Sequence, residues 1–175
     1  MITLPPLPLR PLLHAHYLNM RALWGMGDMP RRGVQHGFEG VVYGVLGKRA
    51  WRPTHISPAG VRAVLDDWAR RGSVVQRAHG VLPGRVDRSV RMEVLMVGAE
   101  LRFEEWWRLF VEGDSTVLIT RGEHVPGRVK SEGDLIRLPP PEEGLFLSSG
   151  FGVAMSARRE GVWLRAAREE LDRNL

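Results

Sequence analysis

Basic side chains and a tryptophan gather in two segments that the sequence predicts to be loops, 28–37 and 47–53. The residues with suitable chemistry there are Arg31, Arg32, Lys48, Arg49, Trp51 and Arg52. Guanidinium groups pair with phosphate oxygens, and an exposed tryptophan gives a base a face on which to stack. The two segments therefore predict contacts to a single nucleic-acid strand. In the alternative interpretation, Trp51 is a core residue surrounded by a solvated basic rim.

A glycine pattern in the stretch EEGLFLSSGFGVAM, residues 142–155, offers a second way to hold phosphates. Gly144 is followed after five residues by Gly150, Phe151 and Gly152, and a β-like run comes next. Because glycine has no Cβ atom, backbone N–H groups can come close to a phosphate there. The alternative is a simple turn between a proline-rich linker and a strand.

This glycine spacing, ahead of a predicted strand, resembles part of the glycine-rich motif of CRISPR repeat-associated RNA-binding proteins. That superfamily includes the repeat-processing endoribonucleases. The resemblance implies ferredoxin-like domains, with the glycine-rich loop packed near bound RNA. The residues that it places beside RNA are Gly144, Gly150, Phe151 and Gly152. The sequence departs from the family pattern at Glu142, where a further glycine is expected, and the segment LFLSS lacks the usual basic residue.

His36, in the first of the two basic segments, is the candidate catalytic residue. The RNA-processing family often has a catalytic histidine in such a region, so the resemblance implies a role for His36 in proton transfer. An imidazole can take the proton of a 2′-hydroxyl group or protonate the leaving oxygen, because its pKa is near neutral. His14 and His16 stand two apart on a predicted helix and make a poor metal pair. We predict no metal and no cofactor.

The composition favours a polyanionic partner. The 175 residues carry a formal net charge of +5, and 23 of the 25 basic residues are arginine. Such a balance favours nucleic acid through counterion release, although a GC-rich genome also replaces lysine with arginine. The absence of cysteine excludes disulfides, thiolate zinc sites and cysteine nucleophiles. With no apolar run of membrane length and no recognisable signal peptide, we expect a cytoplasmic protein that does not contact membranes.

The elements that must position these residues alternate between helices and strands. Hydrophobic periodicity and capping signals predict helices over 11–27, 57–72, 103–112 and 159–175. Runs rich in β-branched residues predict strands over 38–46, 73–79, 88–98, 115–120 and 128–139. The order predicts an α+β fold of two small ferredoxin-like halves, with antiparallel sheets and helices on one face. The predicted halves are 1–82 and 83–175, or one continuous domain.

Two other functions fit parts of the sequence. The capped helix over 57–72, followed by a strand, a basic turn and a second strand, is similar to the recognition helix and wing of winged-helix DNA-binding regulators. The residues expected to contact DNA in that case are Arg62, Arg70, Arg71, Arg77, Arg85 and Arg88. Alternatively, the chain is a structural or adaptor subunit of a phage or multiprotein assembly. The C-terminal helix would then dock through Trp163, Leu164, Ala167 and Leu171.

The sequence as a whole predicts a protein that binds RNA or single-stranded DNA, with protein partners in a ribonucleoprotein effector complex. Enzymatic activity is a secondary expectation, and the predicted reaction is metal-independent RNA cleavage assisted by His36.

Overall fold

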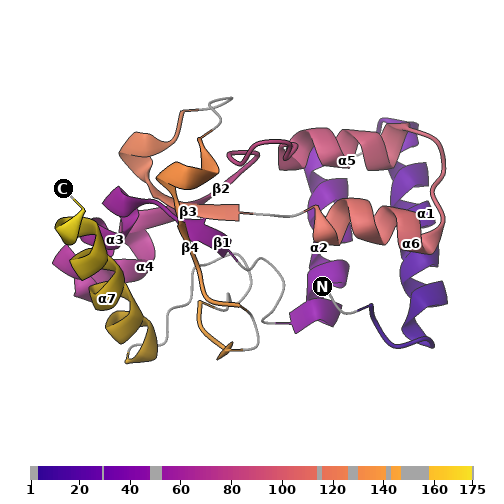
Figure 1. Ribbon diagram of the computed structural model, residues 1–175. Coiled ribbons are helices and arrows are strands. Elements are labelled where there is room, and N and C mark those ends of the chain that lie inside the picture. The colour runs from indigo at the N-terminus through magenta and orange to yellow at the C-terminus, as the bar shows by residue number, and fades with distance from the viewer. Residues whose placement is uncertain are drawn as a thin grey trace. The chain divides into compact units, whose positions relative to one another are not determined.

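The computed structural model describes residues 4–28, 30–47, 53–113, 116–125, 130–140, 143–146 and 158–174. The chain divides into two compact units (Figure 1). Met1–Gly47 and Val86–Asp114 form the first, called here the helical unit. Lys48–Arg85 and Ser115–Leu175 form the second, called here the sheet unit. Each unit is therefore assembled from two segments that are separated in the sequence.

The helical unit contains four α-helices in its described part. They are α1 (Leu9–Met26), α2 (Arg31–Leu46), α5 (Arg88–Val97) and α6 (Phe103–Trp107), and α6 continues into a π-helical turn, η3 (Arg108–Glu112). The helix α1 ends at Gly27, whose φ of 75° is left-handed and so favours glycine. The helix α5 begins after Asp87, whose carboxylate accepts a hydrogen bond from the Ser89 backbone N–H at 2.8 Å.

Aromatic rings fill the core of the helical unit. Tyr17 stacks on Trp106 with ring centroids 5.3 Å apart, and Phe38 meets Phe110 edge to face at 4.8 Å. These four residues and Trp107 are at most 1% exposed. Hydrophobic periodicity predicted a helix over 103–112; α6 and η3 cover this range, and its residues Trp106, Trp107 and Phe110 are buried.

Two segments predicted as strands are helices in this unit. The run 38–46 is the C-terminal part of α2, and 88–98 forms α5. In α5, Met92, Leu95 and Met96 are buried while Val90 and Val94 are half exposed. Burial thus follows the helical period of 3.6 residues and not the period of two that defines a strand. The many β-branched residues made both predictions wrong, because propensity is weaker than packing.

The sheet unit is built on one four-stranded mixed sheet in the order β2-β3-β1-β4. Its strands are β1 (Pro53–Ile56), β2 (Val75–His79), β3 (Thr116–Thr120) and β4 (Ile136–Arg137). The central pair β1 and β3 is parallel, and β4 and β2 flank it in antiparallel orientation. The helices between and after the strands are α3 (Pro58–Asp66), α4 (Arg71–Val74) and α7 (Arg159–Arg173), with short 3-10 turns η2 (Trp68–Arg70), η4 (Arg121–Glu123) and η5 (Glu132–Asp134).

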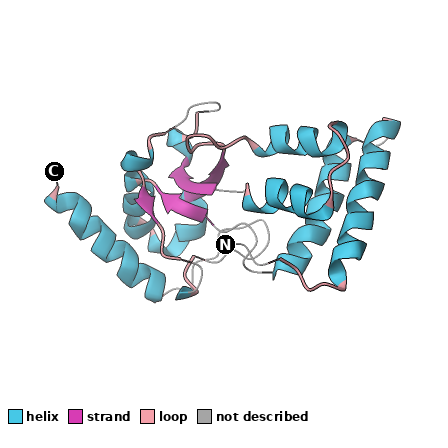
Figure 2. Ribbon diagram, turned by 45° about the vertical axis from the view of Figure 1, so that its right-hand side comes forward, coloured by secondary structure: helices cyan, strands magenta, loops and turns pink. Residues whose placement is uncertain are grey.

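The two faces of this sheet pack against different layers. On one face Leu118 packs with residues of α3 and α7, such as Val61 and Leu164, and α7 lies against α3 (Figure 2). Neighbouring residues of a strand point to opposite faces, so Val117 and Ile119 belong to a second cluster that includes Leu82 and Leu135 from connecting segments. The helices α3 and α7 therefore cover the face of the sheet to which Leu118 points.

The α+β class is confirmed, but the prediction of two ferredoxin-like halves is wrong. The described residues form seven α-helices and a single sheet. Because the segments 38–46 and 88–98 are helical, too few strands remain among the described residues of either half for a sheet of its own. No helix in the described part of the chain is both long enough and apolar enough to span a membrane.

Candidate functional site

The positive charge of the chain is distributed unequally between the two units. The helical unit has 8 basic and 9 acidic side chains, a formal net charge of −1, counted from its sequence ranges. The sheet unit has 17 basic and 11 acidic side chains, a formal net charge of +6. The whole positive excess therefore belongs to the sheet unit, which makes this unit the electrostatic candidate for polyanion binding.

Several arginines of the helical unit serve its interior. Arg91 is 3% exposed and donates to the Phe110 carbonyl at 2.9 Å. Arg21 donates to the Leu95 carbonyl, and also to the Gly98 carbonyl at 2.6 Å. Carbonyls near the C-terminal ends of helices lack intrahelical partners, so these arginines satisfy groups that the fold leaves open. Side chains used in this way contribute little to a phosphate-binding surface.

Arg31, Arg32 and His36 lie on α2, and the prediction of a loop over 28–37 is therefore wrong for residues 31–37. The structure brings the three residues together on the first turns of the helix. Arg31 lies over the Trp24 ring at 5.3 Å from its centroid, with Glu93 3.6 Å away. Arg32 Nε lies 3.4 Å from His36 Nε2.

A buried carboxylate stands beside His36 and was not foreseen from the sequence. Glu39 Oε2 lies 4.0 Å from His36 Nδ1, and its side chain is completely buried. Glu39 accepts hydrogen bonds from Gln35 at 2.9 Å and from Arg88, which also forms an ion pair with it. The spacing of three residues on one helix could have shown the pair, but the predicted change from loop to strand near residue 37 concealed it.

The carboxyl ends of the parallel strands β1 and β3 share a polar network around Glu123. Ser57, the N-cap of α3, accepts from the Gly60 N–H and donates to Glu123 Oε2 at 2.7 Å. The Thr120 backbone N–H and hydroxyl also donate to Oε2, and Lys130 Nζ lies 3.0 Å from Oε1. Burial alone would raise the pKa of Glu123, but the hydrogen bonds from Ser57, Thr120 and Lys130 outweigh it and hold the pKa below its ordinary value. The network joins β1, β3 and the segment that leads to β4.

His55 on β1 is the second histidine with a carboxylate neighbour. Its side chain is 7% exposed, and Nε2 lies 3.5 Å from Glu132 Oε1. Its Nδ1 is 2.9 Å from the Thr54 hydroxyl. Burial lowers the pKa of His55, because desolvation outweighs the opposite effect of Glu132. Neutral imidazole at this position accords with a structural role at the β4 edge.

The remaining predicted site residues are mostly outside the described residues. These are Lys48, Arg49, Trp51, Arg52, Gly150, Phe151 and Gly152. Gly144 is described: its φ is +69°, and an added Cβ atom would meet open space. A side chain there would be strained by the backbone alone. The described residues contain no group of three or more His, Cys, Asp or Glu side chains that could hold a metal ion.

The similarity proposed from the glycine spacing has no support from comparison with known proteins. Its implied ferredoxin-like halves are absent from the described residues, and most of its loop lies outside them. No family model, no curated protein and no solved structure matches this chain.

Proposed function

We propose that this protein binds RNA or single-stranded DNA through its sheet unit. The observation that carries the proposal is the formal charge of +6 on this unit against −1 on the helical unit. Neutralising phosphates releases condensed counterions, which favours binding even without base-specific contacts. Exposed arginines such as Arg121 and Arg165 have no ion-pair partner among the described residues and remain available for phosphates.

Single strands suit these features better than duplex DNA does. A wing needs a second strand, but the segment predicted for it is helix α5 and belongs to the other unit. Two arginines of the predicted recognition helix are also poorly placed to contact DNA, because they form ion pairs within the protein. Arg62 pairs with Asp172 at 3.2 Å, and Arg70 pairs with Asp67. Arg88 is committed to Glu39. Arginines that already pair with carboxylates have few free N–H donors for base edges or phosphates of duplex DNA.

RNA cleavage by His36 is a second candidate function, and one specific observation favours it. The imidazole has a fully buried carboxylate 4.0 Å from Nδ1, while Nε2 faces Arg32. The carboxylate lies beyond hydrogen-bond distance of the ring, and Nε2 accepts from Arg32 Nε at 3.4 Å. Proton transfer at Nε2 therefore requires that Arg32 turns from the imidazole to the phosphate. Incubating RNA with the wild type and with His36→Ala tests this candidate. Metal-independent cleavage by the wild type alone supports it, and intact RNA in both samples excludes it.

Binding itself is tested by titrating the full chain against fluorescent oligonucleotides of one sequence as RNA, single-stranded DNA and duplex DNA. Each titration is run at about 50 mM and about 200 mM salt, because every released counterion steepens the salt dependence. We expect the single strands to bind more tightly than the duplex and to lose at least about tenfold in affinity at the higher salt. If none of the three binds in a salt-dependent way, the proposal fails.

A further inference from the structure

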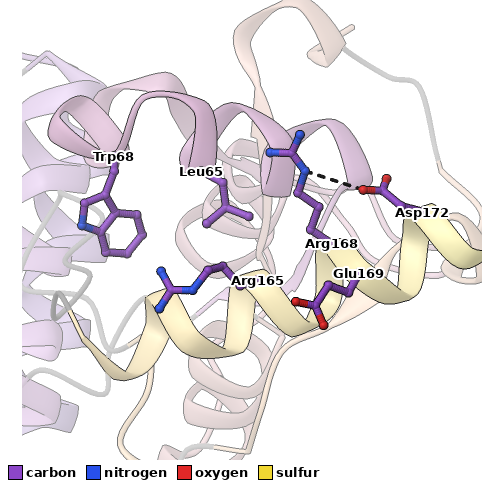
Figure 3. Close-up of a pocket in the computed structure, with 6 residues that line it drawn as sticks. All are labelled: Leu65, Trp68, Arg165, Arg168, Glu169 and Asp172. Carbon is purple, nitrogen blue, oxygen red and sulfur yellow. Dashed lines mark ion pairs between the residues drawn. The ribbon is translucent and has the colours of Figure 1, made fainter.

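The sheet unit contains a groove between α7 and the α3–η2 segment, and the functions proposed above do not use this groove. Six residues line it: Leu65, Trp68, Arg165, Arg168, Glu169 and Asp172 (Figure 3). Trp68 and Leu65 point into it from the α3 side, and the Arg165 guanidinium lies on the Trp68 side of α7 (Figure 3). The cavity volume is about 410 Å³, which is within the range of small-ligand sites.

Of the four charged residues that line this groove, Arg165 and Glu169 are exposed and have no ion-pair partner among the described residues. Arg168 pairs with Asp66 at 2.8 Å and with Asp172 at 3.7 Å. Asp172 also pairs with Arg62 at 3.2 Å, so both aspartates are neutralised by the protein itself. Arg165 is exposed and has no carboxylate within ion-pair distance among the described residues. An unpaired guanidinium beside a tryptophan is a combination that suits a phosphate next to a base.

Trp68 is held in place from two sides. The Arg71 guanidinium lies 4.8 Å from the centroid of its ring and donates to the Trp68 carbonyl at 2.8 Å. Gly161 of α7 lies under the ring edge, where an added Cβ atom would be 3.1 Å from Trp68 Cη2 and 3.5 Å from an Arg165 guanidinium nitrogen. The Trp68 ring edge and the Arg165 guanidinium therefore both lie close to Gly161, and so they lie close to each other. The absence of a side chain at Gly161 lets the Trp68 ring edge pack this closely against α7.

We propose that this groove binds one unpaired nucleotide, with the base stacked on Trp68 and its phosphate paired with Arg165. The inference rests on the proposed function and names the position within the sheet unit where a base is held. Arg71 lies over one face of the indole and the half-buried ring also packs against the core cluster, so the base takes the part of the ring that lines the groove. Stacking on an aromatic ring is tolerant of sequence because every base has a π-face. The site therefore selects single strands over duplexes and not one base over another.

The experiment compares two single-stranded DNA probes of equal length, oligothymidine and an oligonucleotide of abasic residues that keeps the phosphates but has no bases. Binding of the full chain is measured for the wild type, Trp68→Ala, Arg165→Ser and Arg159→Ser. Arg159 is the matched control, because it is an exposed arginine at the start of the same helix and does not line the groove. Circular dichroism and thermal melting show whether each variant is folded.

We expect Trp68→Ala to weaken oligothymidine binding at least about fivefold and to leave abasic binding almost unchanged, because only the stacked base is lost. Arg165→Ser should weaken both probes, and more than Arg159→Ser does. If Trp68→Ala is unfolded, Gly161→Ala is the substitute, since the added methyl group comes within 3.1 Å of Trp68 Cη2 and shifts the ring while both Trp68 and Arg165 remain. Its oligothymidine affinity should then fall by more than its abasic affinity.

The outcomes separate this inference from the proposed function. In one outcome, the wild type binds in a salt-dependent way while the groove variants lose no more affinity than Arg159→Ser does; the groove variants are Trp68→Ala, Gly161→Ala and Arg165→Ser. This result overturns the nucleotide site in the groove but not the proposed function. The groove then fits a protein side chain better than a base. Equal losses for the two probes in Trp68→Ala also overturn it. A wild type that binds neither probe, and that does not bind the RNA oligonucleotide of the salt titration either, removes the proposed function and the groove with it.

Discussion

Some arginines of the helical unit and some of the sheet unit have opposite uses. In the helical unit, Arg21 and Arg91 donate to backbone carbonyls, and Arg88 pairs with the buried Glu39. In the sheet unit, by contrast, Arg121 and Arg165 are exposed and have no ion-pair partner among the described residues. The same type of side chain is thus a structural donor at these positions of the helical unit and an available cation at these two positions of the sheet unit. Net charge is informative about a partner only after the chain has been divided into its units.

The acidic residues follow the same division. In the helical unit they outnumber the basic ones, and Glu39 is completely buried. In the sheet unit, Asp66 and Asp172 form ion pairs with Arg168 and Arg62 on the α3 and α7 surfaces. Because the sheet unit has more basic than acidic side chains, its net charge stays positive when these pairs form. The surplus there is what we assign to phosphate binding.

The largest expected effect concerns the buried pair of the helical unit. Glu39→Ala should lower the free energy of unfolding by about 3–5 kcal/mol, because it leaves the Arg88 guanidinium without its buried partner. Urea denaturation followed by circular dichroism measures this. Glu93→Ala, which removes a carboxylate with a half-exposed side chain from the same unit, is the control and should change the value by less than about 0.5 kcal/mol. Equal effects of the two variants would show that Glu39 is not a structural anchor.

A smaller effect separates the two uses of arginine directly. Arg91→Ala should cost about 2 kcal/mol, since it removes buried packing and leaves the Phe110 carbonyl without its donor. Arg121→Ala, at an exposed position of the sheet unit, should stay within about 0.5 kcal/mol of the wild type. Both values come from the same denaturation assay. A destabilising Arg121→Ala beside a neutral Arg91→Ala would reverse the comparison between the units.

The smallest expected effect tests the polar network of the sheet unit. Glu123→Gln should cost about 1 kcal/mol near neutral pH, because the hydrogen bonds at Glu123 lose their charge. The pKa of Glu123 in the folded protein lies below its ordinary value of 4.5. Its contribution is therefore complete above pH 4.5 and is lost as the pH falls through the folded-state pKa. Thermal midpoints between neutral and acidic pH should fall less steeply for Glu123→Gln, whereas parallel curves would contradict this.

The sequence predicted helices and strands best where pattern and capping signals agreed. The helix α1 ended at a glycine as expected, and Ser57 and Pro58 marked the start of α3. The strands β2 and β3 were also predicted correctly. In α2 and α5 the β-branched residues pointed to strands, while tertiary packing selected helices. In each predicted half, one helical segment was assigned the two-residue period of a strand. These two errors were enough to predict two sheets where the described residues form a single mixed sheet.

The candidate sites could be predicted from the sequence less well than the fold. His36 was singled out for its type, but its carboxylate neighbour became visible only once both residues lay on one helix. The groove joins Trp68 to Arg165, which is almost a hundred residues away, through the packing of α7 against α3. No local pattern encodes such a contact. The charge difference between the units likewise depends on knowing that 86–114 packs with 1–47.

The most direct test of the account is photo-crosslinking of single-stranded RNA that contains 4-thiouridine to the full chain, followed by peptide mapping. We expect the crosslinked peptides to come mainly from 48–85 and 115–175, and competitor RNA and high salt to abolish the crosslinks. Crosslinks concentrated in 1–47 and 86–114, around Arg31, Arg32 and His36, would contradict the assignment of nucleic-acid binding to the sheet unit.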